Sequence, residues 1–363
     1  MYQTFNLYSP LSPPEDYYES TPDWVECSPL AKTKILSELY PPMPVPAVLR
    51  EEETKLLTGK PECSNKAFVA KIPYGRVWGE KAVISPDNKL LWDVSVEWAR
   101  WPQEHSIFQQ KKMPPLTKTE KTVAVLNHPA AYNYYHWMLE VLARIHLLQK
   151  SRFTIDKYII NHRALPFQLE TLALCGITPE KIIRPPVNFH LQAKQLVVPS
   201  YVNLPNQWSV NYVRNIFLSP KIMPPESEGK RIYIKRQSSR KVLNEEELLI
   251  ILNKYNFKSI VLEEIPLKKQ LEIFYNAMVI VAPHGAGLAN LVFCKPGTTV
   301  IELFSPSFLE PHYWLISRLL HLQYRFIVGK RENPHHYWTG FDDLSIAPDQ
   351  LLKALENIDM NNY

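Results

Sequence analysis

Residues 278–288 read MVIVAPHGAGL, an apolar run followed by a Pro-His-Gly-Ala-Gly turn and the start of another apolar segment. The run predicts a buried strand, and the turn predicts that the strand passes at once into a helix. Glycines let backbone approach a ligand closely, and the first N–H groups of the helix point at whatever lies there. The pattern predicts a phosphate or pyrophosphate site beside His284. A tight turn that binds no ligand is the alternative.

The chain on both sides of this turn alternates between strand and helix patterns. Predicted strands are 231–236, 258–263, 278–283, 299–304 and 323–328, and predicted helices begin near 245, 267 and 313. Such alternation indicates a parallel sheet with helices on both faces. Ligands of these sheets bind beyond the carboxyl ends of the strands, where we expect His284 and Glu302.

The first half of the chain is less regular. β-like segments fill residues 66–100, residues 121–129 predict a strand, and residues 134–149 predict a helix. A chain of 363 residues exceeds one ordinary domain. We expect an irregular, Pro-rich arm with a short helix near 31–39, and two α/β domains. The predicted bounds are 1–60 for the arm, 61–215 for the N-terminal domain and 216–363 for the C-terminal domain.

The charge, cysteine content and hydropathy of the chain limit the classes of ligand and the compartment that we expect. The 41 basic and 36 acidic residues give a net charge of +5, and the basic residues do not form one run, so nucleic-acid binding is not indicated. The small basic surplus suits anionic small ligands and leaves contact with an anionic membrane surface open. Four dispersed cysteines favour thiols in a reducing compartment. With no apolar leader or spanning run, we expect a cytoplasmic protein.

A second anion-receptive segment is IKRQSSRK at 234–241, at the carboxyl end of the strand that starts the predicted sheet. Four cations there favour a bound anion, and arginine matches phosphate geometry well. A solvated basic loop is the alternative. Glu302, which ends another strand, is suited to accept both hydroxyls of a ribose. It is equally suited to cap the next segment or to pair with a basic neighbour.

The segment NYYHWMLE at 133–140 carries the candidate catalytic pair. His136 and Glu140 are four residues apart and therefore share a helix face. A carboxylate beside an imidazole orients the ring and raises its basicity, which suits a general base near pH 7. A core histidine among aromatic side chains is the alternative. Asn133, just before the helix, is either a cap or a ligand contact.

Several common motifs are absent from the sequence. It has no GxxxxGK[ST] and no GxGxxG after a strand, which argues against P-loop and dinucleotide-binding proteins. It also lacks HExxH, a metal-binding Asp-x-Asp and the GxSxG of serine hydrolases. We therefore predict no metal site.

The order of NYYHWMLEVLARIHLL (133–148), RIYIKRQSSRKVLNEEEL (231–248) and VAPHGAGLANLVFCKPGTTVIEL (281–303) resembles the family 61 glycosyltransferases. Bacterial members are often labelled capsular polysaccharide biosynthesis proteins, and eukaryotic members include plant xylosyltransferases and protein O-linked N-acetylglucosaminyltransferases. The resemblance covers roughly residues 120–330. It implies a GT-B architecture, in which two Rossmann-like domains face a central cleft, and an inverting reaction with no cofactor and no essential metal.

The resemblance also implies roles for individual residues. The nucleotide-sugar donor, with UDP expected as the nucleotide, would be held by Arg236, Arg240, His284, Gly285, Ala286, Gly287, Glu302 and Asn133. His136 falls on the histidine of the family's Asn-x-x-His helix. The family commonly has aspartate where this chain has Glu140, so either residue of the pair is a candidate base.

The predicted function is transfer of a sugar from a nucleoside-diphosphate donor to a glycan or other hydroxyl acceptor, in polysaccharide biosynthesis. A lipid-linked saccharide acceptor and peripheral contact with the inner face of a membrane fit this function. The alternatives are a non-catalytic nucleotide-sugar or glycan-binding protein and another enzyme of the same fold, such as an epimerase. The His136–Glu140 pair discriminates them, since a binding module does not need it. The sequence does not predict an oligomeric state.

Overall fold

The computed structural model describes residues 12–36, 67–80, 82–95, 97, 100–334 and 339–358. Of these, the residues up to Leu204 form one compact unit, unit 1, and those from Pro205 onward form a second, unit 2. The predicted boundary between residues 215 and 216 falls inside helix α6 (Gln207–Phe217), which belongs to unit 2. Within the described ranges, no helix combines the length and the apolar character needed to cross a membrane.

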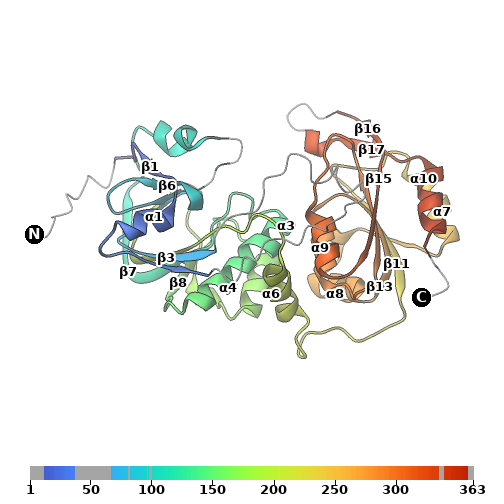
Figure 1. Ribbon diagram of the computed structural model, residues 1–363, viewed down its shortest axis with the longest axis horizontal. Coiled ribbons are helices and arrows are strands. Elements are labelled where there is room, and N and C mark those ends of the chain that lie inside the picture. Colours follow the sequence, from blue (N-terminus) through green and yellow to red (C-terminus); the bar gives the residue numbers. More distant parts are fainter. Residues whose placement is uncertain are drawn as a thin grey trace, which may run out of the picture. The chain divides into compact units, whose positions relative to one another are not determined.

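Unit 2 is built on a five-stranded parallel sheet (Figure 1). Its strands in spatial order are β12 (Lys258–Ile260), β11 (Lys230–Ile234), β13 (Ala277–Pro283), β14 (Thr299–Phe304) and β15 (Gln323–Val328). Numbered along the chain, this order is 2-1-3-4-5, that of a doubly wound α/β sheet. The predicted parallel sheet is confirmed, and β14 and β15 have the predicted bounds.

Helices cover both faces of this sheet. Figure 1 shows α7 (Glu245–Lys254) and α10 (Pro348–Glu356) on one face and α8 (Leu267–Tyr275) and α9 (His312–Leu319) on the other. The remaining elements of unit 2 are η7 (Leu262–Glu264), η8 (Ala286–Phe293), η9 (Thr339–Phe341), β16 (Lys330–Glu332) and β17 (Asp343–Ser345). Leucines of α7 and α10 pack on alternate residues of β13 and β14, as burial of both sheet faces requires.

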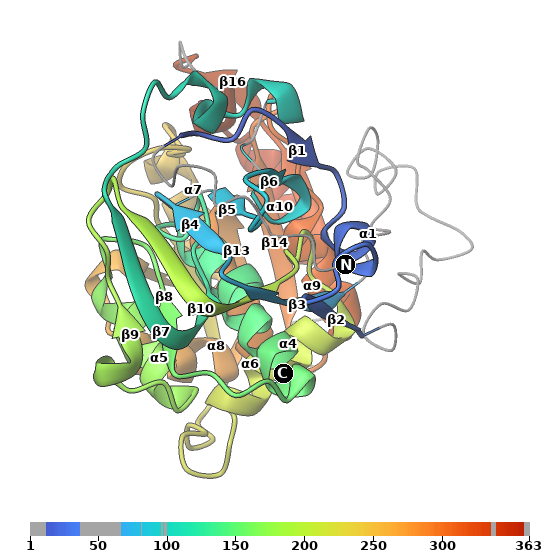
Figure 2. The same ribbon diagram turned by 90° about the vertical axis from the view of Figure 1, so that its left-hand side faces the viewer.

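Unit 1 contains a ten-stranded sheet that is mixed and not fully parallel. Its strands are β1 (Tyr17–Tyr18), β2 (Lys32–Ile35), β3 (Phe68–Pro73), β4 (Arg76–Trp78), β5 (Ala82–Ile84), β6 (Leu90–Leu91), β7 (Leu116–Val125), β8 (Lys157–Ile159), β9 (Ile182–Ile183) and β10 (His190–Pro199). The central strand β10 runs parallel to its neighbour β7 (Figure 2) and antiparallel to β3 and β4. The prediction of a Rossmann-like N-terminal domain is therefore wrong for the β3–β6 part, because β3 and β4 both pair antiparallel with β10, and short turns join β4, β5 and β6 as antiparallel neighbours.

The parallel part of this sheet, β10-β7-β8-β9, carries the larger helices of unit 1. They are α3 (Tyr134–His136), the π-helix η5 (Trp137–Val141), α4 (Leu142–Ser151) and α5 (Pro166–Leu174), with the short η6 (Pro179–Lys181) before β9. The Trp137 indole donates to the Thr171 hydroxyl at 2.8 Å and so joins η5 to α5.

The described part of the predicted arm, residues 12–36, is not irregular. It contains helix α1 (Thr21–Glu26), which Ser20 caps, and the strands β1 and β2. The short helix predicted near 31–39 is wrong over Lys32–Ile35, because this segment pairs with β3 as a strand and sheet pairing overrides local helix preference. Residues 1–11 and 37–60 of the predicted arm lie outside the described residues.

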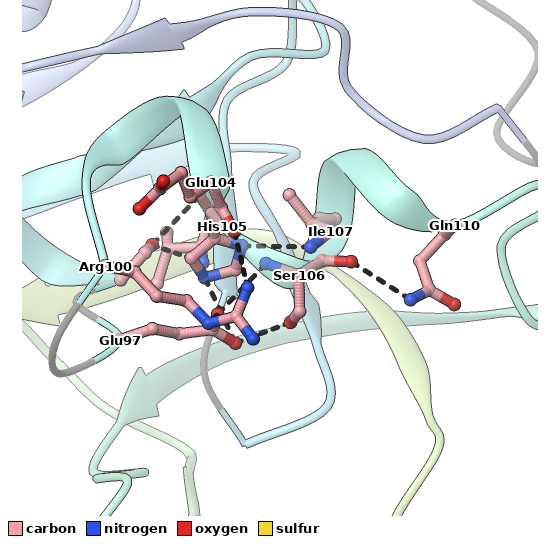
Figure 3. Close-up of polar contacts among 9 residues, drawn as sticks. Glu97, Arg100, Glu104, His105, Ser106, Ile107 and Gln110 are labelled. Atoms are coloured by element: carbon pink, nitrogen blue, oxygen red, sulfur yellow. Dashed lines mark hydrogen bonds and ion pairs between the residues drawn. The ribbon is translucent and has the colours of Figure 1, made fainter.

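The segment after β6 is held by a buried carboxylate (Figure 3). β6 ends at Leu91, and the short turns η2 (Trp92–Val94), η3 (Pro102–Glu104) and η4 (Ser106–Gln109) replace the β-like pattern predicted up to residue 100. The Ser106 amide and hydroxyl both donate to Glu97, at 3.0 and 2.5 Å, and the Ile107 amide donates to His105 Nδ1 at 3.1 Å. These bonds connect neighbouring turns, so this His–Glu group has a structural role.

Candidate active site

The anion-receptive loops of unit 2 meet at the switch point of its sheet. β11 and β13 are neighbours, and the chain leaves β11 toward β12 on one side and β13 toward β14 on the other. In doubly wound sheets the crevice between two such loops binds ligands. A small hollow lies there, lined by Ile234, Lys235, Arg236, Leu262, Glu263, Pro283, Gly285, Gly287 and Leu288. The predicted 236–240 and 284–287 segments are thus brought together.

Arg236 lies directly against the glycine turn. Its Nε donates to the Ser239 carbonyl at 3.1 Å, and a Cβ built on Gly285 would lie 2.2 Å from its Nη1. The φ of Gly285 is 173°, an extended conformation open to any residue, so glycine is required here for space. A Cβ on Gly287 would lie 2.5 Å from Leu262 Cδ1. The glycines therefore admit neighbouring side chains, and at Gly285 that side chain is the Arg236 guanidinium.

Arg240 is the second cation of this site. Its Nη1 donates to the His284 carbonyl at 3.3 Å, and its guanidinium lies 5.3 Å from the Phe308 ring centroid. Burial and the nearby charge of Arg236 lower the pKa of Arg240 to about 10. Its Nε is buried and has no hydrogen-bond partner among the described residues, and neither arginine forms an ion pair there. Two adjacent cations without a carboxylate partner favour a multiply charged anion beside them, as the sequence predicts.

Glu302, the third predicted contact residue of this site, faces the interior of unit 2. It is fully buried, lies 2.5 Å from His284 Nδ1 through Oε1, and accepts from the Tyr324 hydroxyl through Oε2. Burial raises the pKa of Glu302 well above its usual value, although the Tyr324 hydrogen bond and the charge of Arg240 oppose the shift. Both carboxylate oxygens of Glu302 contact side chains inside the protein. This arrangement leaves neither oxygen directed at a ribose. Glu302 instead fixes the ring of His284.

The candidate catalytic helix of unit 1 begins at Asn133. The Asn133 side chain accepts from the Tyr135 amide at 2.9 Å, so of the two predicted roles the structure shows the cap. The helix passes through the π-helical turn Trp137–Val141 before it continues as α4. π-Turns inside α-helices occur frequently at functional sites.

The Glu140 carboxylate contacts two imidazole rings. Its Oε2 lies 2.9 Å from His136 Nδ1 and 3.0 Å from His128 Nε2, and the two rings stack at 5.7 Å. Burial acts to raise the pKa of Glu140, but the hydrogen bonds of His128 and His136 outweigh it and hold the pKa below its usual value. Burial lowers the pKa of His128. His136 is 23% exposed and His128 is 6% exposed, so His136 is the imidazole that a substrate can reach.

A buried arginine supports this cluster. Arg144, one turn after Glu140, donates to the carbonyls of Asn127 and Val125, both at 2.9 Å. Its guanidinium also lies 5.0 Å from the Tyr201 ring, which packs edge-on against His128. These contacts fix the loop that carries His128. Sequence reasoning missed His128, and its only signal was a position near the end of the strand predicted over 121–129.

Two further features bear on the site. Among the described residues, no group of three or more His, Cys, Asp or Glu side chains could hold a metal ion. A large hollow of about 1560 Å³ in unit 1 is lined by α1, the β3–β4 turn and the first half of β7. None of the predicted site residues lines this hollow.

Comparison with known proteins finds similarity to one family of enzymes. Residues 134–301 match the model of the family described as Glycosyltransferase 61. The "EGF domain-specific O-linked N-acetylglucosamine transferase" of Drosophila melanogaster is 32% identical over 123 residues, 31% of this chain and 23% of that protein. The "Beta-1,2-xylosyltransferase" of Arabidopsis thaliana is 35% identical over 75 residues, 20% of this chain and 14% of that protein.

The human "Protein O-linked-mannose beta-1,4-N-acetylglucosaminyltransferase 2" is 33% identical over 92 residues, 24% of this chain and 16% of that protein. The chain thus covers less than a quarter of the length of each of these relatives. The bacterial iron-containing glycosyltransferase TibC of E. coli aligns over 93% of this chain and 90% of its own, with 9% identity and a TM-score of 0.29, too low to inform on the fold. Residues 134–301 are thus similar to the family 61 glycosyltransferases, which supports the predicted enzyme class.

Proposed function

We propose that this protein is an inverting glycosyltransferase that moves a sugar from a nucleoside-diphosphate donor to a hydroxyl acceptor on a glycan or protein. The observation that carries the proposal is the convergence of Arg236 and Arg240 on the switch point of unit 2, where neither has a carboxylate partner among the described residues. The family 61 match and the names of the relatives support the reaction class.

Unit 2 holds the donor in this proposal. The diphosphate lies over the 284–287 turn, where Arg236 and Arg240 neutralise its charge and the first amides of η8 donate to it. As the sugar–phosphate bond breaks, negative charge grows on the departing nucleoside diphosphate. Preorganised cations stabilise this charge and supply the main electrostatic part of catalysis without an essential metal.

Unit 1 handles the acceptor's proton. Because Nδ1 of His136 is bound to Glu140, Nε2 is the ring nitrogen that takes the proton of the acceptor hydroxyl. The deprotonated oxygen attacks the anomeric carbon from the side opposite the leaving group, forms the new glycosidic bond and inverts the configuration. Glu140 is nearly buried between two imidazoles, so we assign the base to His136 and the stabilisation of its protonated ring to Glu140.

The proposal extends to the biological setting. We propose a UDP-linked donor and a role in polysaccharide assembly on a lipid-linked or other saccharide acceptor, at the cytoplasmic face of a membrane. The resemblance of the three motif segments and the small basic surplus support this setting.

Calorimetric titration with UDP, GDP, CDP and dTDP tests the donor site. At least one nucleotide is expected to bind, and Arg240→Ala should weaken that binding by about 10-fold to 100-fold, since hydrogen bonds to charged groups contribute about 1.5–3 kcal/mol. The matched control is Arg318→Ala on α9, which stacks on Trp314 and should keep wild-type affinity. Equal affinity of the Arg240 variant and the wild type would overturn the assignment.

The alternative function, a non-catalytic nucleotide-sugar or glycan-binding protein, predicts a different result. Slow hydrolysis of the donor sugar, measured with EDTA present, should occur in the wild-type protein if it is a transferase. Nucleotide binding without any turnover of a panel of nucleotide sugars would favour the binding protein. Activity lost in EDTA and restored by Mn²⁺ would contradict the metal-independent mechanism.

A further inference from the structure

A third His–carboxylate group lies in unit 1, and the reaction proposed above does not use it. Glu80 Oε1 accepts from the Tyr132 hydroxyl at 2.6 Å, from the His162 amide at 2.6 Å and lies 2.8 Å from His162 Nδ1. The Tyr132 hydroxyl also lies 2.8 Å from His162 Nδ1. Three residues from distant parts of the sequence thus share one oxygen, and we call them the Glu80 cluster.

The Glu80 cluster lies beside the His136–Glu140 pair. β7 and β8 are parallel neighbours with Val125 opposite Ile159, and His128 and His162 each follow three residues after these paired positions. Adjacent strands are about 4.8 Å apart, so both histidines emerge at the same sheet edge. The Asn161 side chain accepts from the His128 amide at 3.1 Å and donates to its carbonyl at 3.0 Å, which ties the two loops together.

The hydrogen bonds of the cluster set what it can offer to a ligand. Burial acts to raise the pKa of Glu80, but the hydrogen bonds of Tyr132 and His162 outweigh it and lower the pKa, so the group is a carboxylate at neutral pH. Burial and Glu80 raise the pKa of Tyr132 to about 12, so its hydroxyl keeps its proton and donates inward. Because these donors are directed at Oε1, the cluster meets a ligand mainly with acceptor groups, the Glu80 carboxylate and the His162 ring, and the Asn161 side chain is a further hydrogen-bond partner of Glu80.

The cluster is also reachable. The His162 and Glu80 side chains are 26% and 16% exposed, so solvent reaches both. A partly exposed carboxylate and imidazole, oriented by a phenol, bind groups that donate hydrogen bonds, and the adjacent hydroxyls of a sugar ring are such groups. An anionic ligand would meet the Glu80 charge, which disfavours phosphates and uronic acids.

We propose that the Glu80 cluster is a binding subsite for neighbouring hydroxyl groups of an uncharged saccharide, next to the proton-accepting His136. The inference rests on the proposed function for its purpose, because it places the acceptor sugar there. It specifies the acceptor as neutral at the ring that this subsite holds, and it makes Glu80, Tyr132 and His162 determinants of acceptor choice.

Saturation-transfer NMR tests the subsite with four probes on the full chain: methyl α-D-mannoside, methyl β-D-galactoside, methyl β-D-xyloside and methyl β-D-glucuronide. At least one neutral glycoside should give a signal that exceeds that of the glucuronide. The signal should fall at least about 5-fold in Glu80→Gln and in Tyr132→Phe, which each remove a hydrogen-bonding group of the cluster. The control Glu180→Gln removes an exposed carboxylate of the same unit and should leave the signal unchanged.

A readout on the wild-type protein guards against misfolded variants. The ring-proton resonances of His162 should shift when the bound glycoside is added. Glu80→Gln is used only if its melting temperature lies within a few degrees of the wild-type value; otherwise Tyr132→Phe is the test variant. Three results would overturn the inference: no signal from any neutral glycoside, a preference for the glucuronide, or equal signals in wild type and both variants. Titration of nucleotides into the same samples separates the proposals, since donor binding without glycoside binding rejects the subsite alone, and the absence of nucleotide binding rejects the proposed function.

Discussion

His136–Glu140 in unit 1 and His284–Glu302 in unit 2 are the same two residue types joined through Nδ1, at 2.9 and 2.5 Å, yet their electrostatics are opposite. The pKa of Glu140 lies below its usual value, because two imidazoles compensate its burial. The pKa of Glu302 lies well above its usual value, because burial dominates. The pair type therefore does not determine the role of the carboxyl group; the number of compensating donors and the exposure do.

Exposure separates the two histidines as well. His136 is 23% exposed, whereas His284 is 7% exposed and offers its backbone carbonyl to Arg240. In the proposed function the first pair transfers a proton, and the second holds the shape of the turn that binds the diphosphate. The following predictions test this contrast, beginning with the largest effect.

His136→Ala should reduce sugar transfer or donor hydrolysis by about 10²- to 10⁴-fold, the usual contribution of a general base. Nucleotide affinity should stay at the wild-type value, because the donor site is formed by residues of unit 2. Turnover measurement with parallel calorimetry checks both. The control His146→Ala changes a histidine of the same helix that does not contact Glu140. Similar losses of activity in both variants would indicate that His136 has only a structural role.

Glu140→Gln and Glu302→Gln should change stability with opposite pH dependence. A lowered folded pKa contributes stability that is present above the usual value of 4.5 and lost in acid, so Glu140→Gln should cost about 2 kcal/mol at pH 7 and less below pH 4.5. A raised folded pKa contributes stability that is present below 4.5 and lost as the pH rises, so the cost of Glu302→Gln should shrink from acid toward neutral pH.

Native-state hydrogen exchange, read separately for each unit, measures these two free energies. If the free energies of unfolding of the two variants changed with pH in the same direction, the two pairs would not differ in the way inferred here. A Glu302→Gln variant that becomes more costly with rising pH would show that Glu302 is ionised in the folded protein.

The same contrast shows what the sequence could predict. The strands of unit 2 are separated by turn residues and helices, so periodicity predicted β14 and β15 to the residue and placed Arg236, Arg240 and His284 at one sheet edge. Whether a strand-terminal carboxylate faces a ligand or the core depends on tertiary packing. The sequence therefore predicted the place of Glu302 but not its direction.

Gly285→Ala should weaken nucleotide binding by roughly 10-fold, or about 1.4 kcal/mol. The new Cβ would lie 2.2 Å from Arg236 Nη1 and would displace the guanidinium from the diphosphate. Gly287→Ala is the matched control, because its Cβ meets only the end of the flexible Leu262 side chain and should cost less. Calorimetry compares the two, and a greater loss in the Gly287 variant would contradict the role assigned to Gly285.

Tyr324→Phe should have the smallest effect, about 1 kcal/mol of unfolding free energy for unit 2. It removes one hydrogen bond to Glu302, which should raise the pKa of that carboxyl further and keep it protonated. Nucleotide affinity should change less than in Gly285→Ala. Urea denaturation followed by unit-resolved exchange gives the free energy, and a loss of affinity equal to that of Arg240→Ala would place Tyr324 at the ligand instead.

In unit 1 the sequence predicted the His136–Glu140 pair because helical spacing is a local property. His128 reaches Glu140 only through the pairing of β7 with its neighbours, and Glu80 reaches His162 across 82 residues of sequence. Contacts of this kind depend on sheet register, which a single sequence does not reveal. The two-residue strand β1 was missed for the same reason.

The 2-1-3-4-5 strand order has a consequence for how unit 2 folds. Its two arginines follow β11 and its glycine turn follows β13, so the proposed anion site does not exist until two segments about 50 residues apart have paired. Such nonlocal pairing is formed slowly in folding, and a ligand that binds only the assembled site shifts the equilibrium by RT ln(1 + [L]/Kd). On the proposed function, a nucleotide at 100 times its Kd should therefore stabilise unit 2 against unfolding by about 2.7 kcal/mol.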